Sequence, residues 1–300
     1  MTRIAISLAA LCLLAFTPAT ASAQSLSPTL QKIKDAGTIT IGHRDSSVPF
    51  SYLDNNQKPI GFSLALCDLV VAKIKAKLNK PDLKVAYQAV NSSNRIPLVK
   101  NGTVDIECGS TANTIARQQE VAYSVIFYAP QFKWIALKSS NLKTTDDLKG
   151  KAVVVTQGTN TAQFVAKLNT EKNLGMKILQ GKDHAESFLL VETGRASAFM
   201  EDDILLAGLK ANAASPDNFA FLGDAYPSDP YGIMMAKGDG EFKKLVDDAL
   251  VEAMKSGLYD KLYAKWFESP IPPKNINLNF PQSEGLKALI KNPSDKAVGQ

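Results

Sequence analysis

The alternation of apolar and polar residues divides the chain into two successive α/β patterns. In the first, a short helix is predicted at 29–35, and β-branched or apolar runs predict strands at 38–42, 83–90 and 104–108. Apolar residues at helical spacing predict helices between these strands, at 62–78 and 95–100. Strands that alternate with helices are typical of a parallel α/β sheet.

The pattern then begins again and predicts a second sheet. The expected strands are 151–155, 177–179 and 196–200, and the expected helices are 158–168, 185–193 and 204–211. A strand at 232–236 and helices at 241–255 and 259–267 follow, whereas the Pro- and Asn-rich segment from Ser269 onward predicts an extended tail. Two such halves usually bind their ligand between them, at the carboxyl ends of strands.

The first residues have the features of a secretory signal peptide. Arg3 precedes an apolar run from Ile4 to Phe16, which is short for a membrane span, and Ala21-Ser22-Ala23 fits a cleavage site. We therefore expect residues 1–23 to be removed after Ala23. The alternative is an N-terminal membrane anchor, but Pro18 and the small residues favour cleavage. Because no later apolar run has membrane length, we expect a soluble exported protein.

Charge and cysteine content exclude several classes of protein. The 34 basic and 29 acidic side chains give a net charge of +5 that is spread along the chain, so we expect no nucleic-acid partner. With two histidines and no CxxC or HExxH motif, we expect no metal site. Gly158-Thr159 lacks the lysine of a phosphate-binding loop, and we expect no cofactor. Beyond the signal segment, Cys67 and Cys108 can form a disulfide or remain two buried thiols.

Arginines at strand ends are the strongest candidates for ligand binding. Arg44 follows a predicted strand, Arg95 opens a helix, and Arg117 lies shortly after another strand. A guanidinium binds a carboxylate with two parallel hydrogen bonds. Each arginine alone has the alternative role of a surface ion pair, but three at equivalent strand ends favour an anion site.

Other candidates lie in the polar loops that follow the strands. Ser110 and Thr159 precede helices, whose free N–H groups bind anions, although simple helix capping is the alternative. Asp202 can hold an ammonium group or cap a helix. His184 can donate to an anion or be purely structural. An enzyme would need a further carboxylate beside Asp202, for which Glu107 and Glu201 are candidates, but no nucleophile motif is present.

Several longer segments resemble the periplasmic glutamate/aspartate-binding proteins of ABC importers, a branch of solute-binding protein family 3. They are Gly42-His43-Arg44 with the following residues to Tyr52, Asn94-Arg95-Ile96-Pro97, Glu107 to Thr111, Lys149 to Thr156, Lys182-Asp183-His184, Asp202-Asp203, and Ile271-Pro272-Pro273-Lys274-Asn275. The similarity spans nearly the whole chain after residue 23.

The resemblance implies a periplasmic binding protein-like II fold, with two α/β lobes joined by two crossover strands. The first lobe would comprise residues 24–128 and 232–300, and the second lobe residues 129–231. It further implies a monomeric, non-enzymatic periplasmic protein that captures L-glutamate or L-aspartate and delivers it to the permease subunits of an ABC transporter.

The resemblance also assigns the groups that would hold the amino-acid end of the ligand. Arg117 would bind the α-carboxylate, with Ser110 and the Thr159 region donating to it, and Asp202 would bind the α-ammonium. Asn160 belongs to the same loop, where such proteins usually have a second threonine.

The acidic side chain of the ligand would be bound by a second set. Arg44 and Arg95 would bind its carboxylate together with Ser92 and His184. Ala112 occupies a position where relatives often have a ligand-binding threonine, so preference between glutamate and aspartate stays open.

Two alternatives remain. Some periplasmic dehydratases of prephenate-like dicarboxylates share this fold, but Asp202 is better explained by an amino group. A binding protein that signals rather than feeds a transporter would have the same sequence pattern.

Overall fold

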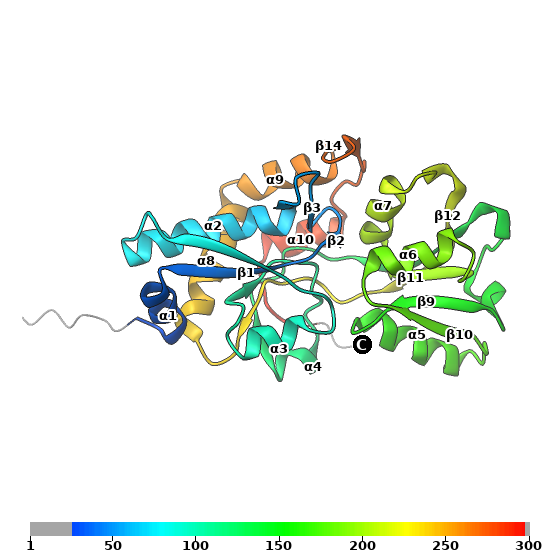
Figure 1. The fold of residues 1–300 in the computed structure, drawn as a ribbon, viewed down its shortest axis with the longest axis horizontal. Coiled ribbons are helices and arrows are strands. Elements are labelled where there is room, and N and C mark those ends of the chain that lie inside the picture. Colours follow the sequence, from blue (N-terminus) through cyan, green and yellow to red (C-terminus); the bar gives the residue numbers. More distant parts are fainter. Residues whose placement is uncertain (1–25, 298–300) are drawn as a thin grey trace, which may run out of the picture.

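A computed structural model describes residues 26–297, which form two α/β lobes that lie side by side (Figure 1). Each lobe has a five-stranded sheet. In order across the first sheet, the strands are β5 (Lys84–Ala89), β1 (Thr38–His43), β6 (Ile106–Glu107), β13 (Met234–Ala236) and β7 (Val121–Tyr123). Those of the second are β10 (Lys177–Gly181), β9 (Ala152–Thr156), β11 (Ala198–Asp202), β8 (Gln131–Leu137) and β12 (Phe219–Pro227).

The first lobe has the strand–helix–strand build expected from its sequence. Strand β1 pairs in parallel with β5 and β6, whereas β13 pairs antiparallel with β6 and β7. One large apolar core joins β1 to helices α1 (Pro28–Ala36), α2 (Phe62–Leu78), α8 (Gly240–Lys255) and α9 (Leu258–Phe267). A smaller core packs α3 (Arg95–Lys100) against β7 and β13, and the short helix α4 (Ile115–Gln118) lies beside β7.

The second lobe is a three-layer sandwich. Strand β9 pairs in parallel with β10 and β11, while β8 pairs antiparallel with β11 and β12. Its two apolar cores lie on opposite faces of the sheet, one with α5 (Asn160–Glu171) and the other with α6 (His184–Glu192) and α7 (Asp203–Asn212). Short 3₁₀ turns occur at Lys138–Ser140, Thr145–Leu148 and Pro216–Asn218.

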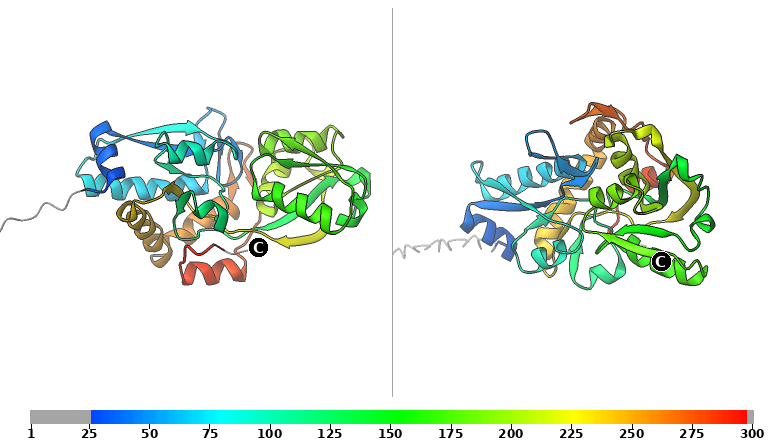
Figure 2. Two further views of the ribbon diagram at one scale, coloured as in Figure 1. Left: turned by 90° about the horizontal axis from the view of Figure 1, so that it is seen from below. Right: turned by 45° about the vertical axis from the view of Figure 1, so that its right-hand side comes forward.

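The chain crosses between the lobes twice, before β8 and after β12, and the views in Figure 2 show the two crossing segments between separate bodies. The crossings are paired, because Tyr231 N donates to Tyr128 O at 2.8 Å and Phe127 N donates to Tyr231 O at 3.0 Å. Two crossing segments held together in this way form the connection expected of a periplasmic binding protein-like II fold.

Strands β8 and β12 were missing from the sequence prediction. Lys133 interrupts the apolar pattern of β8, and β12 contains a register shift between Phe221 and Ala225. Both strands depend on antiparallel pairing with distant segments, which local periodicity does not reveal.

The prediction of an extended tail from Ser269 onward is wrong. Strands β14 (Pro270–Ile271) and β15 (Ile276–Asn277) form a hairpin, and α10 (Glu284–Lys291) follows. The hydroxyl of Ser283 accepts from Leu286 N and caps this helix, and the Leu286 side chain is buried against the first lobe's core. Capping and burial together stabilise a helix that composition alone did not indicate.

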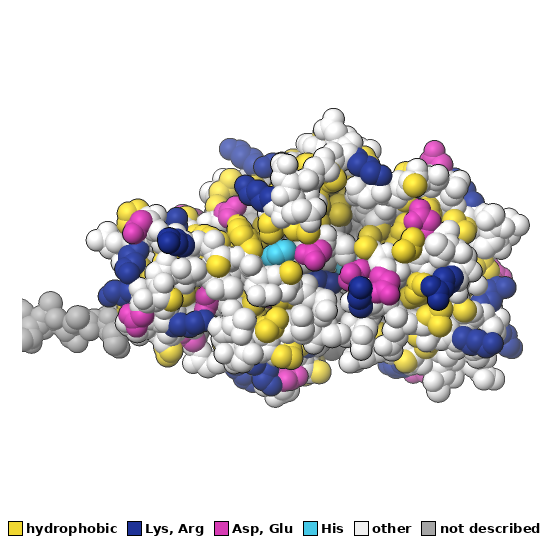
Figure 3. All heavy atoms as spheres, in the orientation of Figure 1, with side chains coloured by type: hydrophobic (Ala, Val, Ile, Leu, Met, Phe, Trp, Pro, Cys, Tyr) yellow, Lys and Arg dark blue, Asp and Glu magenta, His cyan; other side chains and the backbone are white. Residues whose placement is uncertain are grey.

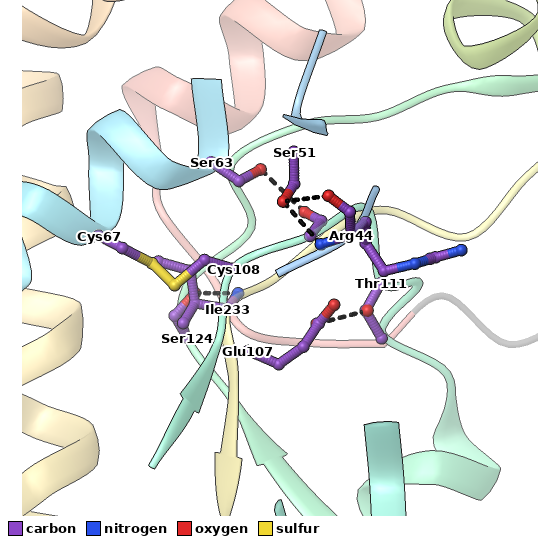
Figure 4. The surroundings of a disulfide bond; sticks show 10 residues. Arg44, Ser51, Ser63, Cys67, Glu107, Cys108, Thr111, Ser124 and Ile233 are labelled. Carbon is purple, nitrogen blue, oxygen red and sulfur yellow. Dashed lines mark hydrogen bonds between the residues drawn. A yellow bond between two sulfur atoms is a disulfide. The ribbon is translucent and has the colours of Figure 1, made fainter. Parts of the chain in front are cut away.

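Cys67 and Cys108 form a disulfide, with their Cα atoms 6.4 Å apart. The bond joins the middle of α2 to the residue that follows β6 (Figure 4). Of the two alternatives left open by the sequence, the structure has the cross-linked one. A further small sheet is formed by β2 (Ser46–Ser47), β3 (Ser51–Leu53) and β4 (Pro59–Ile60). Within residues 26–297, no helix is long and apolar enough to cross a membrane.

Candidate ligand-binding site between the lobes

Arg44 lies directly after β1, and its side chain is 2% exposed. Its backbone is held by Ser51, whose hydroxyl accepts from Arg44 N at 2.9 Å (Figure 4). The Nη1 and Nη2 atoms have no hydrogen-bond partner within residues 26–297. Burial lowers the pKa of Arg44, and the nearby carboxylates of Glu107 and Glu201 oppose that shift. A buried guanidinium with unpartnered donors is suited to binding an anion.

Arg95 is the first residue of α3 and is also 2% exposed. Its Nη1 donates to Thr111 Oγ1 at 2.6 Å, whereas Nε has no partner in the described part of the chain. Burial lowers the pKa of Arg95 to about 9, with a further contribution from the charge of Arg117. Two cations are therefore held out of water in the first lobe, at a cost that a bound anion would offset.

Two serine hydroxyls accompany these arginines. Ser92 and Ser110 are 4% and 6% exposed, and neither hydroxyl has a partner among residues 26–297. Ser92 lies between β5 and α3, and Ser110 lies after β6, so both are at the carboxyl ends of strands. Buried hydroxyls of this kind can each donate one hydrogen bond to a ligand.

Arg117 makes a direct link between the lobes. It lies on α4 and is half-buried, with Nη1 donating to Ala112 O at 3.0 Å and Nη2 donating to Gly158 O at 3.1 Å. Gly158 belongs to the loop after β9 in the second lobe. The predicted strand-end arginines are thus all between the lobes, but Arg117 differs from Arg44 in donating to backbone carbonyls.

The loop after β9 supplies Thr159 and Asn160. The Thr159 hydroxyl donates to Thr156 O at 2.7 Å and accepts from Ala162 N, so it caps α5. Its only proton is thereby used within the loop, and the expected donation from this region falls to the N–H groups that begin α5. Asn160 Nδ2 donates to Asp229 at 2.9 Å.

His184 begins α6 and is 2% exposed. Its Nδ1 lies 3.0 Å from Thr156 Oγ1 and 3.4 Å from Glu201 Oε2. Burial, followed by the charges of Arg44 and Arg95, holds the pKa of His184 well below its ordinary value. The imidazole is therefore neutral near pH 7 and carries one N–H donor.

Asp202 ends β11, with both carboxylate oxygens in hydrogen bonds. Ser228 donates to Oδ1 at 2.6 Å, and the hydroxyl of Tyr231 donates to Oδ2. Burial and the neighbouring Glu201 raise the pKa of Asp202 well above its ordinary value. A cation beside Asp202 would reverse this effect by favouring the ionised form.

The structure therefore brings most of the predicted residues together. Arg44, Arg95 and His184 act on one another electrostatically across the lobe boundary, and Glu201 connects them to Asp202. On the face shown in Figure 3, acidic side chains and a histidine gather where the lobes meet. No group of metal-ligating side chains occurs among residues 26–297.

Sequence reasoning places Thr111 and Thr156 in candidate loops at strand ends without a role for their hydroxyls, and it gives Ser228 and Tyr231 no role in the site. Thr111 and Thr156 each follow a predicted strand, which is a signal that could have found them. Nothing in the sequence around Ser228 and Tyr231 indicates a contact with Asp202.

The lobes also meet outside this polar cluster. Gly208 of α7 packs on Val48, and a Cβ atom at Gly208 would lie 2.5 Å from Val48 O. The ammonium of Lys274, near the end of the chain, donates to Asn212 O at 2.6 Å and to Ala213 O at 3.1 Å. The first lobe thus contacts the middle and the carboxyl end of α7, and the lobes are close together in this structure.

Comparison with known proteins identifies the family. A model of bacterial extracellular solute-binding proteins, family 3, matches residues 39–269, and the chain belongs to that family. Two relatives that are similar over most of this chain are named as binding proteins, not as enzymes.

Individual proteins that are similar to this chain agree with the family assignment. An L-glutamate/L-aspartate-binding protein of Pseudomonas aeruginosa is 51% identical over 279 residues, covering 93% of this chain and 92% of the relative. A glutamate/aspartate import solute-binding protein of Salmonella typhimurium is 50% identical over 270 residues, covering 90% and 89%. Among solved structures, a mutant of ArgBP from T. maritima is similar, with a TM-score of 0.72 and 25% identity, covering 80% of this chain and 99% of that chain.

Proposed function

We propose that this protein captures L-glutamate or L-aspartate between its lobes and delivers it to the membrane subunits of an ABC importer. The observation that carries the proposal is the pair of arginines, Arg44 and Arg95, buried with unpartnered guanidinium donors within residues 26–297. A neutral or basic side chain would not offset the cost of burying two cations there. The names of the relatives in P. aeruginosa and S. typhimurium support the same ligand class.

The ligand's amino-acid end would be held at the lobe boundary. Arg117 would bind the α-carboxylate, together with the Ser110 hydroxyl and the N–H groups that begin α5 near Thr159 and Asn160. Asp202 would bind the α-ammonium, which offsets the unfavourable burial of its carboxylate. Its two hydroxyl partners leave lone pairs that can accept from the ligand.

The ligand's side-chain carboxylate would be bound by Arg44, Arg95, Ser92 and His184. In neutral His184, a proton donated by Thr156 to Nδ1 would leave Nε2 as the N–H donor. Ala112 and Asn160, which replace threonines common in such proteins, would tune the preference between glutamate and aspartate by about 0.5–1.5 kcal/mol for a hydrogen bond.

The domain and export assignments complete the proposal. Residues 24–128 with 232–300 would move as one lobe and residues 129–231 as the other, hinged at the paired segments around Tyr128 and Tyr231. Met1 to Ala23 would be removed during export to the periplasm, a segment that lies outside the described residues. The mature protein would act as a monomer.

Calorimetric titration of the mature protein, residues 24–300, tests this function. Glutamate and aspartate should both bind, and glutamine and asparagine should bind at least about tenfold more weakly, because an amide leaves the buried arginines without a counter-charge. Amides that bind as tightly as the acids would contradict the proposal.

A further inference from the structure

Glu107 is a buried carboxylate that the proposed ligand contacts do not use. It ends β6, in the middle of the first lobe's sheet, where its backbone is paired with Gly42 and Met234. Its side chain is 0% exposed. A carboxylate buried to this degree needs a partner of opposite charge or several hydrogen bonds.

A chain of two hydrogen bonds connects Glu107 to Arg95. Arg95 Nη1 donates to Thr111 Oγ1 at 2.6 Å, and Thr111 Oγ1 donates to Glu107 Oε2 at 2.6 Å. Arginine has no acceptor, so the single proton of the hydroxyl must point at Glu107. Thr111 therefore accepts from the cation and donates to the anion, and it links the two charges without direct contact.

The same carboxylate lies against Arg44. A Cβ atom on Gly109 would be 2.2 Å from Glu107 Oε1 and 2.9 Å from Arg44 Cγ, so both side chains occupy the space that Gly109 leaves open. Figure 4 shows Glu107 and Thr111 joined by their hydrogen bond, with Arg44 next to Thr111 and its guanidinium extending away from the disulfide. The disulfide at Cys108 and the hydrogen bond from Ser63 to Gly109 O fix the backbone of this segment.

The charged groups that would face the ligand's side-chain carboxylate can be added up. Arg44 and Arg95 each carry one positive charge, and Glu107 acts on both of them. From the second lobe, Asp183 and Glu201 also act on Arg44, and His184 is neutral. Arg117, the further cation of the first lobe that acts on Arg95, is assigned to the ligand's α-carboxylate. The other two cations and one anion leave a single positive charge, which matches one carboxylate.

We propose that Glu107 is a specificity-determining residue, which acts through Thr111 and Arg95 to select ligand side chains with one negative charge over those with two. It touches no ligand and works by setting the charge of the arginine pair. The class that it disfavours is the doubly ionised phosphate monoester, for which O-phospho-L-serine is a probe close in length to glutamate. This inference rests on the proposed function, since it concerns the binding of the ligand's acidic side chain.

Wild-type protein provides a first test, because the phosphate of phosphoserine has a second pKa near 6. Affinities for phosphoserine and glutamate are measured at pH 5.0 and pH 7.5. His184, Glu201 and Asp202 face both ligands, so the ratio of the two affinities is compared rather than either affinity alone. Relative to glutamate, phosphoserine should bind at least about fivefold more weakly when its phosphate gains the second charge. A ratio that stays constant or shifts toward phosphoserine overturns the proposal.

The variant Glu107→Gln provides the second test. The amide oxygen still accepts from Thr111, but the charge is gone, so the preference for phosphoserine over glutamate at pH 7.5 should rise by about tenfold or more. Glu120→Gln is the matched control, since Glu120 is an exposed residue of the same lobe paired with Lys100. It should leave the ratio unchanged. Thr111→Val breaks the hydrogen-bonded connection but keeps the charge of Glu107, so it should shift the ratio toward phosphoserine, by less than Glu107→Gln does.

The outcomes separate this inference from the function on which it rests. A purely structural role for Glu107 would weaken both ligands in Glu107→Gln and leave their ratio as in wild type, which overturns the inference alone. Phosphoserine that binds neither protein at either pH also overturns it. A wild-type protein that binds neither glutamate nor aspartate overturns the proposed function together with the inference. If Glu107→Gln does not fold, the pH series on wild type and the ratio in Thr111→Val decide together, and a wild-type ratio in Thr111→Val overturns the inference.

Discussion

The two lobes stabilise their buried charges in different ways. In the first lobe, Arg44 and Arg95 lie close to Glu107, and a hydrogen-bonded threonine connects the anion to a cation. In the second lobe, Glu201 and Asp202 accept from the hydroxyls of Thr161, Ser228 and Tyr231 and from a backbone N–H. The cations that act on Glu201 are Arg44 and Arg95, which belong to the opposite lobe.

Because of this difference, the electrostatic fields of the two lobes are complementary. The first lobe keeps an excess of positive charge and the second an excess of carboxylate. Burial raises the pKa of Glu201 and of Asp202, so their ionised forms are disfavoured where only neutral donors reach them. Contact between the lobes, or a ligand with an ammonium group, supplies the missing cation. An amino acid with an acidic side chain presents each lobe with the charge that it lacks.

The largest effect is expected where the first lobe loses a cation. Arg95→Ala should weaken glutamate and aspartate by about 2–5 kcal/mol, because the ligand carboxylate and Glu107 would both lose their partner. Calorimetric titration measures the loss. Arg195→Ala, at an exposed arginine of the second lobe, is the control and should have no effect. A loss below about 0.5 kcal/mol for Arg95→Ala would place that residue outside the site.

The next effect is expected in the second lobe. Asp202→Asn should weaken glutamate by about 1.5–3 kcal/mol, the range for a hydrogen bond to a charged group. Glutarate, which has no ammonium, should bind the variant as well as or better than it binds wild type. If Asp202→Asn weakened glutamate and glutarate equally, Asp202 would stabilise the fold of the site rather than bind the ammonium group.

A smaller effect concerns the pH dependence of stability. The pKa of His184 is held well below its ordinary value in the native state, so the unfolded state binds more protons as pH falls below about 6.5. The stability that this provides is present above pH 6.5 and is lost as pH falls toward the native pKa.

Urea unfolding at pH 7.5 and pH 5.5 measures this loss. Between these values, wild type should lose about 1 kcal/mol more than His184→Gln. Identical losses would mean that the pKa of His184 is not lowered in the native state, so that the buried imidazole gains its proton as readily as in the unfolded chain. This result would weaken the contrast between the lobes, since the second would then gain a cation of its own at pH 5.5.

The smallest effect is expected at the contact remote from the charges. Lys274→Met removes the ammonium that joins the first lobe to the carbonyls of Asn212 and Ala213. Ligand affinity should fall by about 0.5–1 kcal/mol, equally for glutamate and aspartate, because closure loses exposed hydrogen bonds. Lys291→Met, at another exposed lysine, should leave affinity unchanged. An effect that differs between the two ligands would contradict a role in closure alone.

Local signals in the sequence are enough to predict much of the fold. The predicted helices 62–78 and 95–100 coincide with α2 and α3, since apolar spacing and the Asn-Gly stop fix both ends. The strands β8 and β12 and the helix α10 could not be predicted in the same way. Their stability comes from antiparallel pairing and burial against segments far away in the chain.

The same limit on prediction from local sequence applies to the candidate site. Arginines after strands indicated an anion site, and Arg44 and Arg95 are buried together as that reasoning implies. The Thr159 region is expected to donate to a ligand, and its hydroxyl caps α5, which is the alternative that the sequence leaves open. Thr111 follows a predicted strand, but its role and that of Tyr231 depend on partners 16 and 29 residues away, and no local pattern identifies those partners.

The position of β13 determines the order in which the lobes can be completed during synthesis. Residues 131–227 form the second lobe's sheet without interruption, and they can pair fully before the last part of the chain is made. The first lobe's sheet cannot, because β13 lies between β6 and β7. A nascent chain that ends before Met234 has a finished carboxylate-bearing lobe, while the arginine-bearing lobe still has two unpaired strand edges. The half of the candidate site that contains Arg44 and Arg95 is therefore assembled last.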